Sequence, residues 1–224
     1  MNRFSLTLLA GAAVLSMATA ASAADLLVQQ QPSLGGYVDM GGGGSWDGAY
    51  VGGFVGYGWG TVLDDNGDIP LGLDDDQLGL SGWLIGATLG ANFTVAEGFV
   101  VGAVGDIAWS NISGYDSDTD LGYDVNWMGS LRGRAGFDAG AFMPYLTGGL
   151  AFAGATADIG PDSSTQMHFG WTAGAGVEVA ATENLSVDLL YRYSDYGSAT
   201  YDLSIPTDLS LTTHTVSAGL NFKF

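Results

Sequence analysis

Apolar and polar residues alternate along the last part of the chain. Residues 213–224 read Thr-His-Thr-Val-Ser-Ala-Gly-Leu-Asn-Phe-Lys-Phe. Because successive side chains of a β-strand point to opposite faces, this segment would have one mostly apolar face and one polar face. It is therefore predicted to form an amphipathic strand.

Seven earlier segments show strand-like patterns. Together with the last one they give eight expected strands, at residues 49–62, 81–95, 98–112, 122–138, 143–157, 166–180, 185–197 and 211–224. The connections after the second, fourth and sixth strands are tight and cover residues 96–97, 139–142 and 181–184. The other connections are longer, polar and rich in Asp. This alternation is typical of bacterial outer-membrane barrels, so the long loops are expected to face outside the cell.

The length of the chain limits the number of strands. No segment after residue 23 offers the unbroken apolar run of about 18 residues that a spanning helix needs. Without such a helix, a membrane chain must close its strands into a barrel, because lipid cannot satisfy open backbone groups. Strands of about 9–11 residues within the membrane allow eight of them in residues 47–224, and exclude a porin of about 16 strands. The predicted fold is all-β: a closed eight-stranded antiparallel transmembrane β-barrel with short periplasmic turns and longer extracellular loops.

The beginning of the chain has the three parts of a secretory signal peptide. Arg3 precedes an apolar stretch over residues 6–15, and Ala21-Ser22-Ala23 follows as a cleavage signal. Cleavage is expected between Ala23 and Ala24, so residues 1–23 would be removed. Residues 24–46 contain glutamine and glycine runs without periodicity and are expected to be a flexible linker. The chain has no cysteine, which excludes a lipid anchor on cysteine, disulfides and thiolate metal sites.

The charge of the chain is strongly acidic. After residue 23 there are 24 acidic residues against four basic ones, a net charge of −20. Such a chain is not expected to bind nucleic acid, which requires Lys and Arg against phosphate. Lysine is almost absent, and the polar strand faces are rich in glycine, which suits a narrow lumen better than a water-exposed surface. On strand 122–138, this polar inward face is expected to include Asn126 and Ser130.

Strand parity places six charged side chains on the inward face of the barrel. They are Asp106, Arg132, Arg134, Glu178, Asp188 and Arg192. Hairpin geometry would bring Asp106 roughly opposite Arg132. In a later hairpin Glu178 would face Asp188, and two facing carboxylates repel unless a cation such as Arg192 or Arg134 lies nearby. Three acids and three arginines balance, so we expect a neutral ion network that plugs the lumen. The alternative is a wet channel that the six side chains line without touching.

Candidate catalytic and metal-binding residues are few. By parity, His168 points inward near the outer end of its strand and His214 points outward, so the two histidines are not expected to share a site, and no enzymatic activity is predicted. The run Asp64-Asp65-Asn66-Gly67-Asp68 suggests a calcium loop. However, an EF-hand needs Gly at its sixth position and Glu at its twelfth, where this chain has Ile69 and Asp75. No cofactor or defined metal site is expected, although weak divalent-cation binding by this loop stays open.

Several short motifs together resemble the alphaproteobacterial outer-membrane barrel family, the RopB-like major surface proteins. The matching segments are Trp46–Gly53, Val101–Ser110, Arg132–Gly136, Pro144–Ala151, Gly170–Glu178 and Tyr191–Tyr193. The resemblance implies the architecture of the OmpA membrane domain and OmpX, and a surface-exposed, envelope-stabilising barrel without a family-wide enzymatic activity. The second strand departs from the family pattern, with Leu84-Ile85-Gly86-Ala87 where a polar residue and tyrosine are common.

The last strand also resembles the recognition signal of bacterial outer-membrane proteins. The residues that carry this resemblance are Ser217, Gly219, Phe222 and Phe224. It implies insertion by the outer-membrane assembly machinery. The other expected partners are outer-membrane lipid and lipopolysaccharide, and the barrel is expected to be a monomer.

Three functions remain open from the sequence. The leading hypothesis is a structural and surface-interaction protein of the Gram-negative outer membrane. The second is a narrow porin or small-solute channel, and the third is a surface ligand receptor or adhesin. The contents of the lumen discriminate between the first two, because eight strands leave an interior just wide enough for side chains to fill.

The alternation of tight turns and long loops generates a topological prediction. Epitope tags inserted near Asp65 or Asp118 should be reached by antibody on intact cells, because both positions lie in loops expected outside the cell. The measurement is immunofluorescence before and after permeabilisation, with a tag at residue 140 in a tight turn as the control. Labelling of the loop tags only after permeabilisation would reverse the topology.

Overall fold

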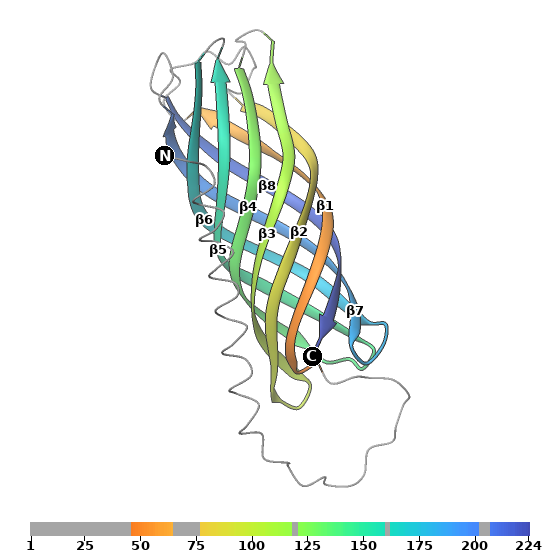
Figure 1. Cartoon of the computed structure of the whole chain (residues 1–224). Coiled ribbons are helices and arrows are strands. Elements are labelled where there is room, and N and C mark those ends of the chain that lie inside the picture. The colour runs from red at the N-terminus through yellow and green to blue at the C-terminus, as the bar shows by residue number, and fades with distance from the viewer. Residues whose placement is uncertain (1–45, 65–76, 118–120, 160–161, 202–206) are drawn as a thin grey trace, which may run out of the picture. The chain divides into compact units, whose positions relative to one another are not determined.

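The chain forms a closed barrel of eight antiparallel strands (Figure 1). The computed structural model describes residues 46–64, 77–117, 121–159, 162–201 and 207–224. The strands are β1 (Gly48–Asp64), β2 (Gln77–Ala96), β3 (Phe99–Asp116), β4 (Leu121–Phe137), β5 (Phe142–Ile159), β6 (Asp162–Ala180), β7 (Leu185–Tyr201) and β8 (Thr207–Lys223). Each strand pairs with the next, and β8 returns to pair with β1. The predicted fold is therefore confirmed. In the described part of the chain, no helix has the length and apolarity to cross a membrane.

Parts of the sequence analysis lie outside the described residues. These are the predicted signal peptide with its cleavage between Ala23 and Ala24, the linker up to residue 45, and the Asp-rich loop over residues 65–76.

The register explains how the barrel closes. On one side of β1 the pairs run from Gly48↔Asn92 to Leu63↔Gln77, and on the other side from Tyr50↔Lys223 to Asp64↔Leu209. Tight turns connect the strands at the opposite end from the long loops. Gly98 and Gly140 occupy two of these turns with φ of 73° and 83°, a conformation that glycine adopts without a steric penalty. The tight turns thus hold three hairpins in fixed register.

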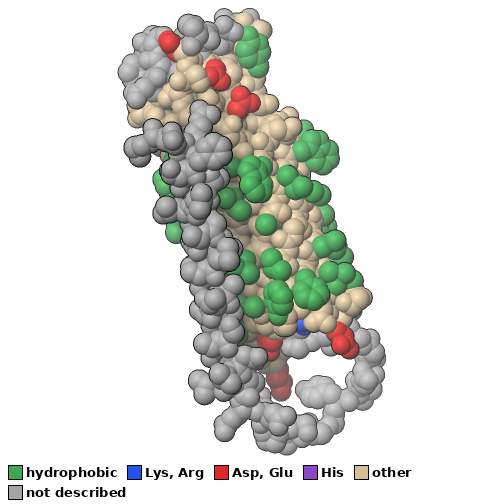
Figure 2. All heavy atoms as spheres, viewed as in Figure 1, with side chains coloured by type: hydrophobic (Ala, Val, Ile, Leu, Met, Phe, Trp, Pro, Cys, Tyr) green, Lys and Arg blue, Asp and Glu red, His purple; other side chains and the backbone are tan. Residues whose placement is uncertain are grey.

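Apolar side chains cover the outside of the middle of the barrel (Figure 2). Towards the long loops, this band ends in a girdle with one ring-bearing side chain from each strand: Trp59, Trp83, Trp109, Trp127, Phe152, Phe169, Tyr193 and His214. Ladder pairs join several of these, such as Trp109↔Trp127 and Phe152↔Phe169. Aromatic belts of this kind mark the interface between membrane and water. We therefore place the outer boundary of the bilayer at the girdle.

All eight strands continue beyond the girdle and form what we call the collar. The collar comprises residues 60–64, 77–82, 110–116, 121–126, 153–159, 162–168, 194–201 and 207–213. Here the polarity of the two faces is reversed. The inward side chains are apolar and buried, and include Val62, Leu78, Leu80, Ile112, Leu121, Tyr123, Val125, Ala153, Ala155, Ala157, Leu209 and Leu211. The outward ones are mainly Ser, Thr, Asn and Asp, and several bond to each other, as Thr61 does to Thr212 at 3.1 Å.

The collar explains why the strands are longer than predicted. Every strand extends beyond its expected end on the side of the long loops. For example, β2 begins at Gln77 instead of residue 81, and β6 begins at Asp162 instead of residue 166. The sequence analysis assigned apolar side chains to the outside and polar ones to the inside. This assignment holds in the membrane, where lipid is the outer solvent, and it fails above the girdle, where water is the outer solvent.

One parity prediction is wrong. Asn126 was expected on the inward face of β4 together with Ser130, but it is exposed and donates a hydrogen bond to Thr156 Oγ1 at 2.9 Å. The cause is a β-bulge between Val125 and Trp127, where the register of β4 against β5 shifts by one residue. An extra residue in one strand exchanges its inward and outward positions beyond that point. Below the bulge, Ser130 is buried in the lumen as predicted.

Candidate functional site

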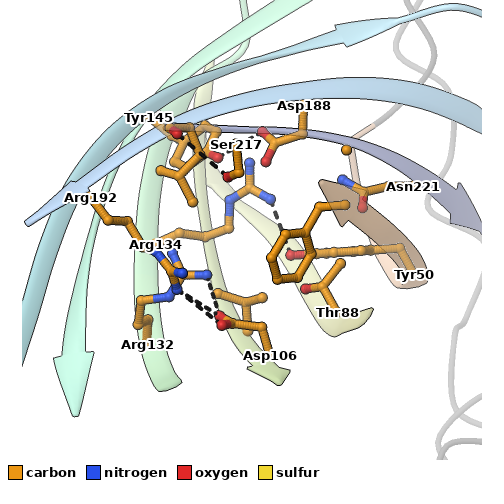
Figure 3. Close-up of a pocket in the computed structure, with 14 residues that line it drawn as sticks. Tyr50, Thr88, Asp106, Arg132, Arg134, Tyr145, Asp188, Arg192, Ser217 and Asn221 are labelled. Atoms are coloured by element: carbon orange, nitrogen blue, oxygen red, sulfur yellow. Dashed lines mark hydrogen bonds and ion pairs between the residues drawn. The ribbon is translucent and has the colours of Figure 1, made fainter. Parts of the chain in front are cut away.

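The centre of the barrel interior contains a network of buried charges (Figure 3). Asp106 on β3 is its hub. It accepts hydrogen bonds from Ser130 Oγ at 2.6 Å, from Arg132 Nη2 at 2.7 Å, and from Arg192 Nη1 at 3.0 and 3.2 Å. The side chains of Asp106, Arg132 and Arg192 are only 2%, 5% and 6% exposed. Three strands, β3, β4 and β7, are thus joined across the lumen by one carboxylate.

The register at this hub differs slightly from the prediction. The residue opposite Asp106 is Ser130, and Arg132 lies one inward position further along β4, opposite Val104. Arg132 bends back to the hub, and its Nε donates to Ser130 Oγ at 2.8 Å. The long, flexible arginine side chain spans this diagonal step, so the Asp106–Arg132 ion pair forms even though the two residues are not a direct cross-strand pair.

Glu178 on β6 organises a second group. It accepts hydrogen bonds from Arg134 Nη2 at 2.7 Å, from Ser186 Oγ at 2.5 Å and from Asn221 Nδ2 at 3.0 Å. Arg134 also donates to the Tyr50 hydroxyl at 3.1 Å. Both side chains of the Arg134–Glu178 pair are 4% exposed. This group connects β4, β6, β7, β8 and β1.

The third carboxylate, Asp188, is held in a different way. It faces Glu178 across the β6–β7 ladder, which confirms the predicted register. Its described hydrogen-bond donor is the hydroxyl of Tyr145, at 2.7 Å, and no Lys or Arg of the described residues forms an ion pair with it. The guanidinium of Arg134 lies over the Tyr145 ring, 3.9 Å from its centroid. Arg134 is therefore the cation near the two facing carboxylates.

Arg192 takes a different partner from the one expected. Its place on β7 suggested the facing carboxylates of Glu178 and Asp188, yet it binds Asp106 on β3 instead. Leu190 separates Arg192 from Asp188 along the inward face of β7. The ion pair to Asp106 crosses the lumen, so it depends on the stagger of the strands around the barrel, which strand parity does not determine.

The network leaves little free space. It contains three arginines and three carboxylates, and two of the carboxylates, Asp106 and Glu178, form ion pairs. Buried charges of this kind are tolerated only when their hydrogen-bonding groups are largely satisfied. In the described structure, Arg134 Nε and Arg192 Nε have no hydrogen-bond partner. A cavity of about 30 Å³ lies among Asp106, Arg134 and Asp188, which is room for on the order of one or two waters.

Buried apolar side chains lie on both sides of this network along the lumen. Towards the outside lies the apolar interior of the collar. At the periplasmic end, Trp46 packs against Val100 and Met143. The ring of Trp46 is 6% exposed, and its Nε1 donates to Asp138 Oδ1 in the β4–β5 turn at 3.1 Å. Trp46 was assigned to the end of a linker, yet it is part of the barrel interior. Its signal in the sequence was a large apolar residue directly before the first strand.

Neutral partners of the ion network were also missed. These are Tyr50, Tyr145, Ser186 and Asn221. All four have the inward parity of their strands, which is the signal that could have identified them. Their hydroxyl and amide groups use hydrogen-bonding capacity that the ion pairs leave open.

The two histidines have separate surroundings, as predicted. His168 is buried inside the collar, where its Nε2 lies 2.8 Å from the Tyr201 hydroxyl and 3.1 Å from the Tyr123 hydroxyl. His214 lies on the outside, stacked on Trp59, with its Nδ1 2.8 Å from the Tyr191 hydroxyl. The described hydrogen bonds of the two rings are made with tyrosine hydroxyls and with the carbonyl oxygen of Gly197. Among the described residues, no group of three or more His, Asp or Glu side chains could hold a metal ion.

The comparisons with known proteins agree with this geometry. The family model "Outer membrane protein beta-barrel domain" matches residues 8–224. The chain belongs to this family. A relative from Brucella abortus, the "25 kDa outer-membrane immunogenic protein", is 36% identical over 217 residues, which is 95% of each chain. The "22 kDa outer membrane protein" of Rhizobium leguminosarum is 32% identical and covers 81% of this chain and 79% of its own.

Solved structures show the same fold. Neisserial surface protein A has a TM-score of 0.52 at 19% identity, covering 79% of this chain and 97% of its own. OprG from Pseudomonas aeruginosa has a TM-score of 0.50 at 15% identity, covering 82% of this chain and 99% of its own. The chain is thus an integral β-barrel of the Gram-negative outer membrane, with buried ion pairs inside the barrel.

Asp106 forms ion pairs with two arginines, whereas Asp188 accepts a hydrogen bond from the Tyr145 hydroxyl. This difference leads to a stability prediction. Asp106→Asn should lower the free energy of unfolding by about 3–5 kcal/mol, because it leaves two buried arginines without their counter-charge. Asp188→Asn is the matched control and should cost much less, about 1 kcal/mol, because Tyr145 can still donate to the amide oxygen. The measurement is denaturant unfolding in lipid vesicles, followed by tryptophan fluorescence. Equal losses for the two variants would contradict the assignment of Asp106 as the hub.

Proposed function

We propose that this barrel is a structural, surface-exposed component that reinforces the outer membrane and does not conduct solutes. The proposal is supported by the buried side chains that occupy the lumen. Along the barrel axis, the Trp46 cluster, the ion network and the apolar interior of the collar lie in series. A solute would have to displace all three layers, which differ in chemistry. An ion would be opposed by the two apolar layers, and an apolar solute by the charged one.

The ion network also supports a mechanical role. Asp106 connects β3, β4 and β7, while Arg134 and Glu178 connect β1, β4 and β6. The bonds from Arg192 to Asp106 and from Arg134 to Tyr50 and Glu178 join strands that are not neighbours, whereas the ladder bonds run only between neighbouring strands. Cross-links of this kind resist flattening of the barrel under lateral pressure from the membrane. Breaking one of them leaves an uncompensated buried charge, so the distorted state is costly.

The collar supports exposure on the cell surface. Barrel strands need about 9–11 residues to cross the membrane, whereas these strands have 17–20. The additional residues present a rim of Ser, Thr, Asn and Asp beyond the girdle. The Brucella relatives are named immunogenic, which fits a protein that is reached from outside. We expect the corresponding surface of this chain to be reached in the same way.

The proposed partners follow from the outer face. The apolar band fits outer-membrane lipid, and the outer boundary at the girdle fits the headgroups of lipopolysaccharide. On β8, Phe222 and Phe224 point outward at the periplasmic end, while Ser217 is buried in the lumen. This arrangement is compatible with recognition of the last strand by the assembly machinery, and with a barrel that acts as a monomer.

The filled lumen generates a prediction for electrophysiology. The unmutated protein in planar bilayers should give no large, steady single-channel conductance, because three layers of side chains close the lumen. Asp106→Asn should remain closed as well, since both apolar layers are intact. A known open porin in the same bilayer is the control. Stable steps from the unmutated barrel would favour the porin hypothesis instead.

A deletion strain tests the reinforcing role. Loss of the chain should raise the sensitivity of the source bacterium to detergent several-fold, because the envelope loses a rigid barrel, while uptake of small hydrophilic nutrients stays unchanged. Expression of the intact chain from a plasmid should restore resistance. Slower uptake with normal detergent resistance is the result that a channel would give, and it would count against the proposal.

A further inference from the structure

The wall of the collar has a long interruption between β6 and β7. The ladder between these strands runs from Ala180↔Ser186 to Trp171↔Asp195 and ends there. Beyond it, no ladder pair joins residues 162–170 to residues 196–201, although both stretches are described. The edges of these two strands that face away from the interruption are paired. β6 pairs with β5 up to Ile159↔Asp162, and β7 pairs with β8 up to Tyr201↔Thr207. We call this interruption the β6–β7 seam.

A bend in β7 causes the seam. The backbone N–H of Gly197 donates to Asp195 Oδ1 at 3.0 Å, which forms a local turn within the strand. Gly197 has φ of 61°, in the left-handed region that favours glycine. The register against β8 shifts between Asp195 and Ser198. On β6, an ideal Cβ at Gly170 would lie 1.8 Å from the Asp195 carbonyl oxygen, so only glycine fits at the base of the seam.

His168 bridges the seam with its side chain. Its Nδ1 lies 3.3 Å from the carbonyl oxygen of Gly197, which can only accept, so Nδ1 carries the proton of the neutral ring. Nε2 is then the acceptor for the Tyr201 hydroxyl at 2.8 Å. Both bonds run from β6 to β7. The Tyr123 hydroxyl on β4 completes a triangle, 2.9 Å from that of Tyr201. All three side chains are buried, so water does not compete for these bonds.

We propose that the β6–β7 seam is a lateral door in the collar and that His168 is its latch. Between β4 and β5 or β5 and β6, parting the strands of the collar breaks a row of backbone hydrogen bonds, whereas here it breaks a few side-chain bonds. The β2–β3 ladder also ends early, at Ser81↔Ser113, but the stretch beyond it is shorter. Behind the seam lies the apolar interior of the collar, with Tyr196 and Ala155 among its residues. Opening the door exposes this interior sideways, above the girdle, while the ion network below stays closed. The inference goes beyond the proposed function, because a closed, reinforcing barrel does not require a door.

Hydrogen–deuterium exchange of the full barrel in lipid nanodiscs tests the latch. Tyr201→Phe removes one oxygen and with it one of the two bonds from His168 to β7, and His168→Phe removes both bonds across the seam. Each should speed exchange about tenfold at the amides of residues 162–168 and 198–201 that pair with β5 and β8, because an open door exposes these two edges to water. Exchange at the outer β4–β5 pairs, residues 121–125 and 155–159, should stay unchanged, because these residues have ladder partners on both sides.

Tyr123→Phe is the matched control, because it removes the same kind of hydroxyl from the same triangle but leaves the His168–Tyr201 bond in place. It should change exchange at the seam by less than about threefold. An equal effect of Tyr123→Phe and Tyr201→Phe, or faster exchange throughout the collar, would show an ordinary core cluster and overturn the proposal. The unmutated protein gives an independent check if the variants do not fold. Its outer β6 and β7 pairs should already exchange faster than the outer β4–β5 pairs, and equal protection would also overturn the proposal.

Discussion

The structure depends on one constraint: inside a bilayer, the chain must satisfy every backbone hydrogen bond by itself. Eight strands meet this constraint only because β8 pairs with β1, from Tyr50↔Lys223 to Asp64↔Leu209. Closure at this strand number fixes a narrow interior. The inward side chains must then fill that interior, and the composition of the lumen follows from the closure of the ladder.

The side chains inside the barrel change in polarity along the barrel axis, because the surroundings of the barrel change from lipid to water. Within the membrane, the apolar side chains are needed on the outside, so the inside carries polar and charged residues that must neutralise each other. Asp106 forms ion pairs with Arg132 and Arg192, Glu178 forms one with Arg134, and Asp188 is the third carboxylate of the lumen. Above the girdle, water surrounds the barrel, and the apolar side chains move inside as in a soluble protein. Within one strand, the inward face is therefore polar in the membrane and apolar above the girdle, and the outward face shows the reverse pattern.

Much of the fold could be predicted from the sequence, because it depends on local periodicity. The number of strands, the tight turns and the cross-strand pair Glu178↔Asp188 all follow from alternation within hairpins. The partner of Arg192 could not be predicted in this way, since its bond to Asp106 crosses the lumen and depends on the stagger of distant strands. Asn126 was misplaced for a different reason. A one-residue bulge has no strong signature in the pattern, yet it exchanges the faces of the strand beyond it.

The water around the collar explains why the strand ladder between β6 and β7 can be interrupted there. Within the membrane, an interruption such as the β6–β7 seam would leave backbone groups without water or partners, at a cost of several kcal/mol for each group. Above the girdle, water can satisfy such groups, so the constraint that closes the barrel no longer applies to every position. The ladder of β6 and β7 ends at Trp171↔Asp195, and Trp171 packs against the girdle residue Tyr193. The wall between β6 and β7 is therefore continuous within the apolar band, and its interruption begins at the level of the girdle, where water begins to replace lipid.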